Sequence, residues 1–225
     1  MTQSFPFKAV IFDMDGVLID TEFYYWNEIR RFSEDLGLGI TKAELDAEVG
    51  QSHQTFQRNV AFWLERAGKG VVEPAVAGQM FNDWSKNHVK NYDELLNPGI
   101  HETIDELKRR GVRVALASST PLEGIKEALE GCKLTDAFEL VVSGADFTES
   151  KPNPEIYLHT IRALGLAAED CCCVEDSVPG ITAGKAAGLT VFAKREDRFG
   201  FSQDAADVII DEVPDILEAA PRLFG

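Results

Sequence analysis

The sequence lacks any apolar segment that approaches the ~20 residues of a membrane-spanning helix. The apolar run near its start, AVIF at 9–12, has only four residues. The first residues, MTQSFPFK, also lack the charged and apolar regions of a signal peptide. We therefore expect a cytoplasmic protein that has no membrane partner.

Basic residues are also scarce. The 225 residues include 22 Lys and Arg against 38 Asp and Glu, which gives a formal net charge of −16. Such a surface repels a nucleic acid backbone, so we expect no nucleic-acid partner, and no protein partner is implied. Solubility is the simplest meaning of this acidity. If the substrate carries phosphate, however, a bound cation and a few well-placed basic residues must offset the field.

Only four cysteines are present, Cys132 and the consecutive Cys171, Cys172 and Cys173. Neighbouring residues on a strand point to opposite faces, so three in a row cannot together bind one zinc ion. We predict that they are small buried side chains on a central strand.

Apolar residues make up 44 % of the chain and charged residues 27 %, as in ordinary folded proteins. Short apolar runs alternate with segments whose apolar residues recur every three or four positions, as in helices. The runs are AVIF (9–12), VRVALA (112–117), FELVVS (138–143), CCCVE (171–175), LTVFA (189–193) and ADVIID (206–211). Thr120 and Asn153, each followed by proline, are predicted helix N-caps. The pattern predicts an α/β fold with a Rossmann-like parallel sheet, covered by helices on both faces.

Residues 20–94 have a different pattern of apolar residues. Their apolar positions fall at helical intervals as far as Tyr92, and no convincing strand is present. Thr41 and Glu44 have the spacing of a capping box. We therefore predict a helical cap domain at 20–94, inserted after the first strand of an α/β core formed by residues 1–19 and 95–225.

Two acidic residues, Asp13 and Asp15, directly follow the first predicted strand. The carboxyl ends of parallel strands face the ligand crevice, so both side chains should reach it on one short loop. Gly16 allows the backbone to turn there. Two carboxylates this close can divide the chemistry between nucleophilic attack and proton transfer, although an Asp-x-Asp pair alone is weak evidence.

Three further segments place polar groups at the ends of strands or helices. Ser118, Ser119 and Thr120 follow the second strand and form a natural anion cradle beside a helix N-terminus, where Thr120 is also expected to cap the helix. Lys151 precedes a rigid Pro-Asn-Pro helix entry and can serve as a point charge for phosphate.

Glu175 and Asp176 add two acids at the end of the cysteine strand. Four carboxylates at one edge would repel each other unless a hard cation lay among them. Mg²⁺ prefers oxygen ligands and commonly joins carboxylates to a substrate phosphate.

These four segments resemble, in order and spacing, the four signature motifs of the haloacid dehalogenase superfamily across essentially the whole chain. The resemblance implies that Asp13 attacks phosphorus and that Asp15 acts as acid and base. It also implies that Ser118 and Lys151 hold the phosphoryl group. The cofactor it implies is Mg²⁺, held by Asp13, the backbone carbonyl of Asp15, and Asp176. Glu175 would either bind the ion or support a residue that does.

The branch that the sequence most resembles contains sugar-phosphate phosphatases and beta-phosphoglucomutases. Further residues expected to contact the substrate are Ser119, Gly16, Thr21, His53 and Tyr25. The mutases carry a histidine shortly after the first motif and an arginine in a cap loop. Tyr25 and His53 stand at these positions here, and neither supplies the same chemistry.

We therefore expect an Mg²⁺-dependent phosphatase that acts on a small phosphorylated metabolite, a sugar or polyol phosphate monoester, through an aspartyl phosphate. A beta-phosphoglucomutase-like mutase is the alternative enzyme. A receiver-like or phosphometabolite-binding protein is the alternative without catalysis. A receiver, however, needs no helical insert. A binding protein would be marked by the loss of a motif carboxylate, and none is lost here. Asp15 argues against carbon–halogen chemistry, because the haloacid dehalogenases proper lack this second carboxylate. GITAGKAAG (180–188) has one residue too few between its glycines for a P-loop and is better explained by close helix packing.

Overall fold

The structure is a computed structural model that describes residues 4–88 and 90–223. The chain forms two compact units. One, here called the α/β unit, comprises Met1–Asp20 and Tyr92–Gly225. The other, called the helical unit, comprises Thr21–Asn91. None of the helices within the described residues is both long enough and apolar enough to cross a membrane.

A six-stranded sheet organises the α/β unit, with the strand order β3-β2-β1-β4-β5-β6. All of its neighbouring strands run parallel, which confirms the predicted parallel sheet. The strands are β1 (Ala9–Phe12), β2 (Arg113–Ser118), β3 (Leu140–Ser143), β4 (Cys171–Glu175), β5 (Thr190–Lys194) and β6 (Val208–Ile210). In the centre, Phe12 of β1 lies opposite Leu116 of β2 and Val174 of β4. Strands β1, β2 and β4 therefore end side by side at one edge.

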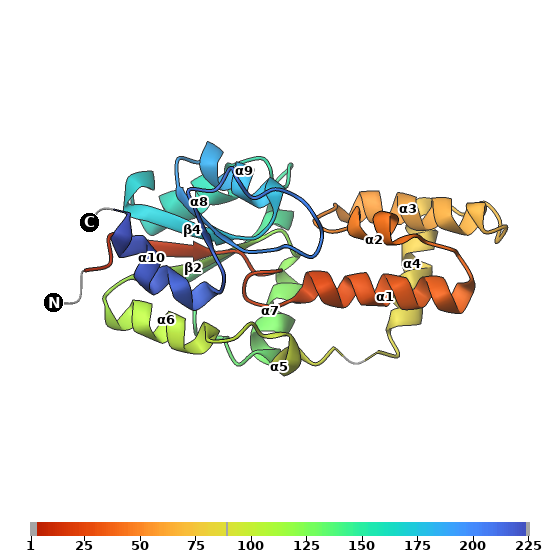
Figure 1. The fold of residues 1–225 in the computed structure, drawn as a ribbon, viewed down its shortest axis with the longest axis horizontal. Coiled ribbons are helices and arrows are strands. Elements are labelled where there is room, and N and C mark those ends of the chain that lie inside the picture. Colours follow the sequence, from red (N-terminus) through yellow and green to blue (C-terminus); the bar gives the residue numbers. More distant parts are fainter. Residues whose placement is uncertain (1–3, 89, 224–225) are drawn as a thin grey trace. The chain divides into compact units, whose positions relative to one another are not determined.

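Helices cover both faces of this sheet (Figure 1). Those of the first layer, which pack with the side chains of Phe12, Leu116 and Phe192, are α6 (Ile100–Arg109), α7 (Leu122–Gly131) and α10 (Ile216–Arg222). Those of the second layer, which pack with Ile11, Ala115 and Val191, are α8 (Glu155–Leu164) and α9 (Val178–Ala186). Short helices complete the unit, namely α5 (Tyr92–Leu95) and the 3₁₀ turns η1 (Gly144–Asp146), η2 (Ala168–Asp170) and η3 (Val213–Asp215).

The three consecutive cysteines lie on β4 and are fully buried, as predicted. Cys171 and Cys173 pack in the layer of α8 and α9, whereas Cys172 faces the opposite layer. Burial raises the pKa of Cys172 and Cys173 well above its ordinary value. These thiols therefore act as packing groups of the sheet.

The predicted helix starts at Thr120 and Asn153 are wrong by one residue. Pro121 and Pro154 themselves occupy the N-cap positions of α7 and α8. Asn153 still accepts a hydrogen bond from the backbone N–H of Glu155 (2.9 Å). The Thr120 hydroxyl, in contrast, is directed away from α7 and bonds to the loop after β1.

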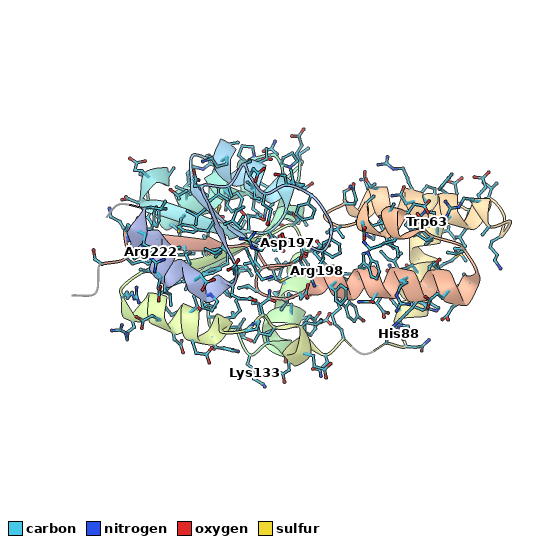
Figure 2. All side chains as sticks on the ribbon, viewed as in Figure 1. Trp63, His88, Lys133, Asp197, Arg198 and Arg222 are labelled. Atoms are coloured by element: carbon cyan, nitrogen blue, oxygen red, sulfur yellow. The ribbon has the colours of Figure 1, made fainter. Side chains whose placement is uncertain are left out.

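The helical unit has its own apolar core, which contains Phe32, Trp63 and Phe81; Trp63 is labelled in Figure 2. Its helices are α1 (Thr21–Leu36), α2 (Lys42–Asp46), α3 (His53–Arg66) and α4 (Pro74–Ser85). The predicted capping box of Thr41 and Glu44 is confirmed.

The helical spacing that continues to Tyr92 in the sequence does not correspond to one continuous helix, because α4 ends at Ser85. Beyond this end, His88 bonds to the buried carboxylate of Glu28 on α1. The side chain of His88 therefore supports a contact with another helix instead of extending α4.

Candidate active site

The loop after β1 carries Asp13 and Asp15. The backbone N–H of Asp13 donates to Val174 O (3.0 Å), so Asp13 prolongs the pairing of β1 with β4. The loop then turns at Gly16, whose φ is 81° and whose N–H donates to Ile19 O (2.7 Å). Buried Asn97 donates from Nδ2 to the carbonyls of Gly16 (3.2 Å) and Val17 (2.8 Å). The loop is therefore fixed by hydrogen bonds at its turn.

Lys151 joins two of the acidic residues. Its Nζ lies 2.6 Å from Asp13 Oδ1 and 2.7 Å from Glu175 Oε1, and it donates a third hydrogen bond to Ala117 O (3.0 Å). These bonds use all three donors of the ammonium group. The paired side chains are almost completely buried, with exposed fractions of 6 % for Lys151, 10 % for Asp13 and 0 % for Glu175.

Burial opposes charge on both members of the Lys151–Asp13 pair. It raises the pKa of Asp13, with a further increase from Glu175 and Asp15, while Lys151 acts in the opposite direction. Burial also disfavours the ammonium of Lys151, but the carboxylates of Asp13 and Glu175 outweigh it and raise the pKa of Lys151. Lys151 therefore stays protonated and offsets part of the negative charge.

Tyr157 is a residue of this site that the sequence analysis did not assign. It is fully buried on α8, its hydroxyl donates to Glu175 Oε1, and its ring lies 5.0 Å from Lys151 Nζ. Burial, followed by the charge of Glu175, raises the pKa of Tyr157 well above 10. Tyr157 is therefore a neutral donor that holds both Glu175 and Lys151.

Asp13, Glu175 and Asp176 form a compact acidic cluster. Each offers one carboxylate oxygen within 4.8 Å of the other two. Asp176 approaches Gly16 so closely that a Cβ there would lie 1.9 Å from Asp176 Oδ2. The glycine therefore creates the room that the carboxylate occupies.

The donor set of this cluster fits Mg²⁺, because all of its ligand atoms are carboxylate oxygens. Within residues 4–88 and 90–223, no donor reaches the buried Oε2 of Glu175. A buried carboxylate oxygen without a partner is costly, and a cation would offset that cost. The residues present therefore suit a hard divalent cation.

The Asp15 carboxylate faces the turn after β2 and does not join the described acidic cluster. Its Oδ2 lies 2.7 Å from Thr120 Oγ1 and 3.4 Å from Ser118 Oγ. Ser118 Oγ also accepts from the backbone N–H of Thr120 (3.1 Å), whereas Ser119 is exposed on the same turn. The resemblance implies that Asp15 binds the cation through its backbone carbonyl, and this role stays a prediction.

Thr21, Tyr25 and His53 belong to the helical unit. Thr21 is buried at the start of α1. The Tyr25 hydroxyl accepts a hydrogen bond from Lys90 Nζ (2.8 Å), and His53 pairs with Gln57 (2.9 Å) at the start of α3. Their contact with a substrate stays a prediction.

The segment that resembles a P-loop lies mainly on α9 and packs closely against its neighbours. A Cβ on Gly180 would lie 1.9 Å from Glu175 Oε2, and one on Gly184 would lie 2.7 Å from the sulfur of Cys173. These glycines therefore allow α9 to approach β4, in agreement with the packing interpretation.

Known proteins resemble this chain in sequence and in fold. The family model of haloacid dehalogenase-like hydrolases matches residues 7–188. A phosphorylated carbohydrates phosphatase from Thermotoga maritima is 33% identical over 189 residues, covering 81% of this chain and 82% of that protein. A beta-phosphoglucomutase from Bacillus subtilis is 25% identical over 211 residues, covering 93% and 91%.

A similar fold occurs in the crystal structure of CbbY from Rhodobacter sphaeroides in complex with phosphate. Its TM-score is 0.72 at 24% identity, and the match covers 92% of this chain and 94% of that one. The family match spans four of the six strands and all the acidic residues of the site. The chain thus belongs to the haloacid dehalogenase-like hydrolases.

Proposed function

We propose that this protein is an Mg²⁺-dependent phosphatase that hydrolyses a small phosphate monoester, a sugar or polyol phosphate, through an aspartyl phosphate on Asp13. The observation that carries the proposal is the pairing of Asp13 with Lys151 next to Asp15. It supplies a nucleophile, a fixed positive charge and a second carboxyl group for proton transfer. The phosphatase from Thermotoga maritima supports the choice of substrate class.

The residues that would hold the cation are Asp13, Asp176 and the backbone carbonyl of Asp15, with Glu175 adjoining them. When bound, Mg²⁺ would neutralise carboxylate charge and polarise the phosphoryl oxygens. Lys151 would exchange one of its present hydrogen bonds for a phosphoryl oxygen, and Ser118 would donate to another. Positioning and charge compensation of this kind dominate phosphoryl transfer.

Two displacements complete the proposed reaction. An oxygen of Asp13 attacks phosphorus, the ester P–O bond breaks, and protonated Asp15 gives its proton to the leaving alcohol. Asp15 then takes a proton from a water molecule that attacks the aspartyl phosphate. Inorganic phosphate leaves, and both aspartate side chains return to their starting states. Splitting the hydrolysis in this way replaces one difficult step with two easier ones.

A panel of phosphate esters assayed with Mg²⁺ tests this proposal. It should include hexose, pentose, polyol, glycolate and nucleotide phosphates, with released phosphate as the readout. We expect turnover of sugar or polyol esters that requires Asp13. Equal turnover by the Asp13→Asn variant, or no hydrolysis of any ester, would contradict the proposal.

A phosphosugar mutase is the second candidate, because a beta-phosphoglucomutase is among the relatives. The family's mutases use a histidine and an arginine where this chain has Tyr25 and His53. A tyrosine hydroxyl is a poor acid or base near neutral pH, and histidine lacks the permanent bidentate cation of arginine. Without a second phosphate clamp, water is the favoured attacker of the intermediate.

The two candidates separate in one assay with β-glucose 1-phosphate, Mg²⁺ and a trace of glucose 1,6-bisphosphate. We expect phosphate release without efficient formation of glucose 6-phosphate. Efficient formation of glucose 6-phosphate without phosphate release would identify a mutase.

A further inference from the structure

The end of β5 and the segment that follows it bury polar side chains to which the proposed reaction assigns no role. Lys194, Glu196 and Gln203 have exposed fractions of only 7 %, 4 % and 5 %. Burying such groups is unfavourable unless each finds partners, so their contacts indicate what the segment supports. Among them, Gln203 reaches the backbone of Asp176, directly after β4 and within the acidic cluster.

The amide of Gln203 lies where β4 and β5 separate. The last paired residues of these strands are Glu175 and Ala193, so the next carbonyls, those of Asp176 and Lys194, lie beyond the ladder. Gln203 Nε2 donates to both, at 2.6 Å and 2.7 Å. One side-chain amide thus replaces the missing ladder contacts and fixes the backbone of Asp176.

The opposite end of this amide is fixed as well. Its Oε1 accepts from the backbone N–H of Glu196 (3.0 Å). Two carbonyls on one side and one N–H on the other leave a single satisfactory orientation of the amide. Gln203 can therefore neither flip nor shift without breaking a buried hydrogen bond.

Glu196 connects Gln203, through Arg198, to Asp20 at the end of the loop after β1. Its Oε1 accepts from the N–H and Nε of Arg198, both at 2.9 Å. Arg198, labelled in Figure 2, donates two hydrogen bonds to the carboxylate of Asp20, at 2.7 Å and 2.8 Å. The chain of contacts thus runs from Asp176 to Asp20, the last residue of the α/β unit before α1.

In this arrangement the side chain and backbone of Asp176 have little room to move. Its carboxylate already fills the space left by the missing side chain of Gly16. The same carboxylate lies within 4.8 Å of the oxygens of Asp13 and Glu175, so a shift of the Asp176 backbone would disturb both contacts. A ligand that must meet a small, strictly octahedral ion cannot tolerate such a displacement.

We infer that Gln203 is a positioning residue of the cation site, one that holds Asp176 through its backbone carbonyl so that the carboxylate keeps its place beside Asp13. This inference rests on the proposed function, because it assumes that the acidic cluster binds Mg²⁺. Gln203 itself touches neither the cation nor the substrate. Loss of a supporting hydrogen bond at a metal site typically weakens metal binding by about 10–100-fold.

The test is a titration of the full chain with Mg²⁺ in the absence of substrate. Mg²⁺ binding is measured by calorimetry and by the shift in melting temperature. Gln203→Met preserves the side-chain length and removes all three hydrogen bonds. Gln203→Glu keeps the acceptor for Glu196 and removes both donors to the carbonyls. We expect each to bind Mg²⁺ at least about 10-fold more weakly. Excess Mg²⁺ should restore most of kcat, while KM for the ester at saturating Mg²⁺ stays near the wild-type value.

Arg195→Ala is the matched control. It lies on the same segment, but its guanidinium pairs with Asp211 at the surface (2.7 Å), so its Mg²⁺ affinity should equal that of the wild type. Wild-type Mg²⁺ affinity in folded Gln203→Met and Gln203→Glu would overturn the inference. Failure of both variants to fold would also overturn it, in favour of a purely structural role. If the wild-type protein binds no Mg²⁺, the proposed function fails as well, and the two failures are thereby distinguished.

Discussion

The hydroxyl of Thr120 donates a hydrogen bond of 2.7 Å to Oδ2 of Asp15. The two residues are 105 positions apart in the sequence and meet because β1 and β2 are neighbours. Since Asp15 is the proposed acid and base, this bond fixes the group that exchanges protons. The Thr120 hydroxyl therefore supports Asp15 and does not cap α7.

Thr120→Val should lower kcat by about tenfold, because it keeps the shape of the side chain and removes the donor to Asp15. A hydrogen bond to a charged group, which Asp15 becomes once it has given up its proton, contributes about 1.5 kcal/mol or more, which corresponds to that factor in rate. Steady-state kinetics on the preferred ester measure the effect. Thr120→Ser retains the hydroxyl and is the control. Equal activity in the valine and serine variants would show that the bond has no part in turnover.

Asp13→Asn should preserve the fold, since the change is nearly isosteric, and lower kcat by on the order of 10³ or more, about 4 kcal/mol. The amide cannot form an acyl phosphate by direct attack. The measurement is phosphate release together with circular dichroism, and Asp146→Asn, at an exposed aspartate of the same unit, is the control. Near-normal turnover would remove Asp13 from the nucleophile's role.

Asp176→Asn should abolish activity, as should a chelator, and added Mg²⁺ should restore only the chelated wild type. The amide offers a neutral ligand where the cluster needs charge, and Ca²⁺ should substitute poorly because its larger and looser coordination misplaces the reacting groups. Activity across an Mg²⁺ series after chelation measures this, with the exposed Asp204→Asn as control. Full activity of the wild type in excess chelator would exclude the metal mechanism.

Glu44 should stabilise the helical unit in a pH-dependent way. Hydrogen bonds from Arg66 and Thr41 lower the pKa of this carboxyl from 4.5 to about 2 in the folded state. Its contribution is therefore fully present above the unfolded pKa near 4.5 and is lost as the pH falls through about 2. Glu44→Gln should lower the melting temperature at pH 6, and the gap from the wild type should close toward pH 2.

The control for Glu44 is Glu34→Gln, which alters an exposed pair with Arg30 on α1. Exposed pairs of this kind contribute little, so the melting temperature should barely change. A gap for Glu44→Gln that stayed constant between pH 6 and pH 2 would contradict the assigned cause.

The sheet was predictable from the sequence because its signal is local. Each strand is a short apolar run, and parallel strands covered on both faces need no alternation of polar residues. The burial of Cys171–Cys173 followed from the same pattern. The ends of helices were less predictable, since Thr120 could either cap α7 or bond to Asp15, and only tertiary contacts decide between the two.

The supporting residues of the site carry no local signal. Tyr157 is 18 positions from Glu175, and Gln203 is 27 positions from the carbonyl of Asp176 that it binds. The sequence presents the tyrosine as one apolar position of a helix and the glutamine as an ordinary polar residue of a loop. Their partners are defined by the packing of α8 and by the separation of β4 from β5. The catalytic, metal and substrate roles assigned from the resemblance stay predictions.

The backbone N–H of Asp20 donates to Leu95 O (2.8 Å), and that of Asn97 donates to Leu18 O (2.8 Å). The chain therefore leaves and re-enters the α/β unit through two neighbouring segments that are hydrogen-bonded to each other. The 71 residues Thr21–Asn91 thus form an insertion whose two ends lie close together. In engineering terms this is a replaceable module. A few glycines could join Asp20 to Tyr92 at a small cost in loop entropy, and the sheet with its two helix layers would keep every internal pairing. The same junction could accept a different module of similar end-to-end spacing.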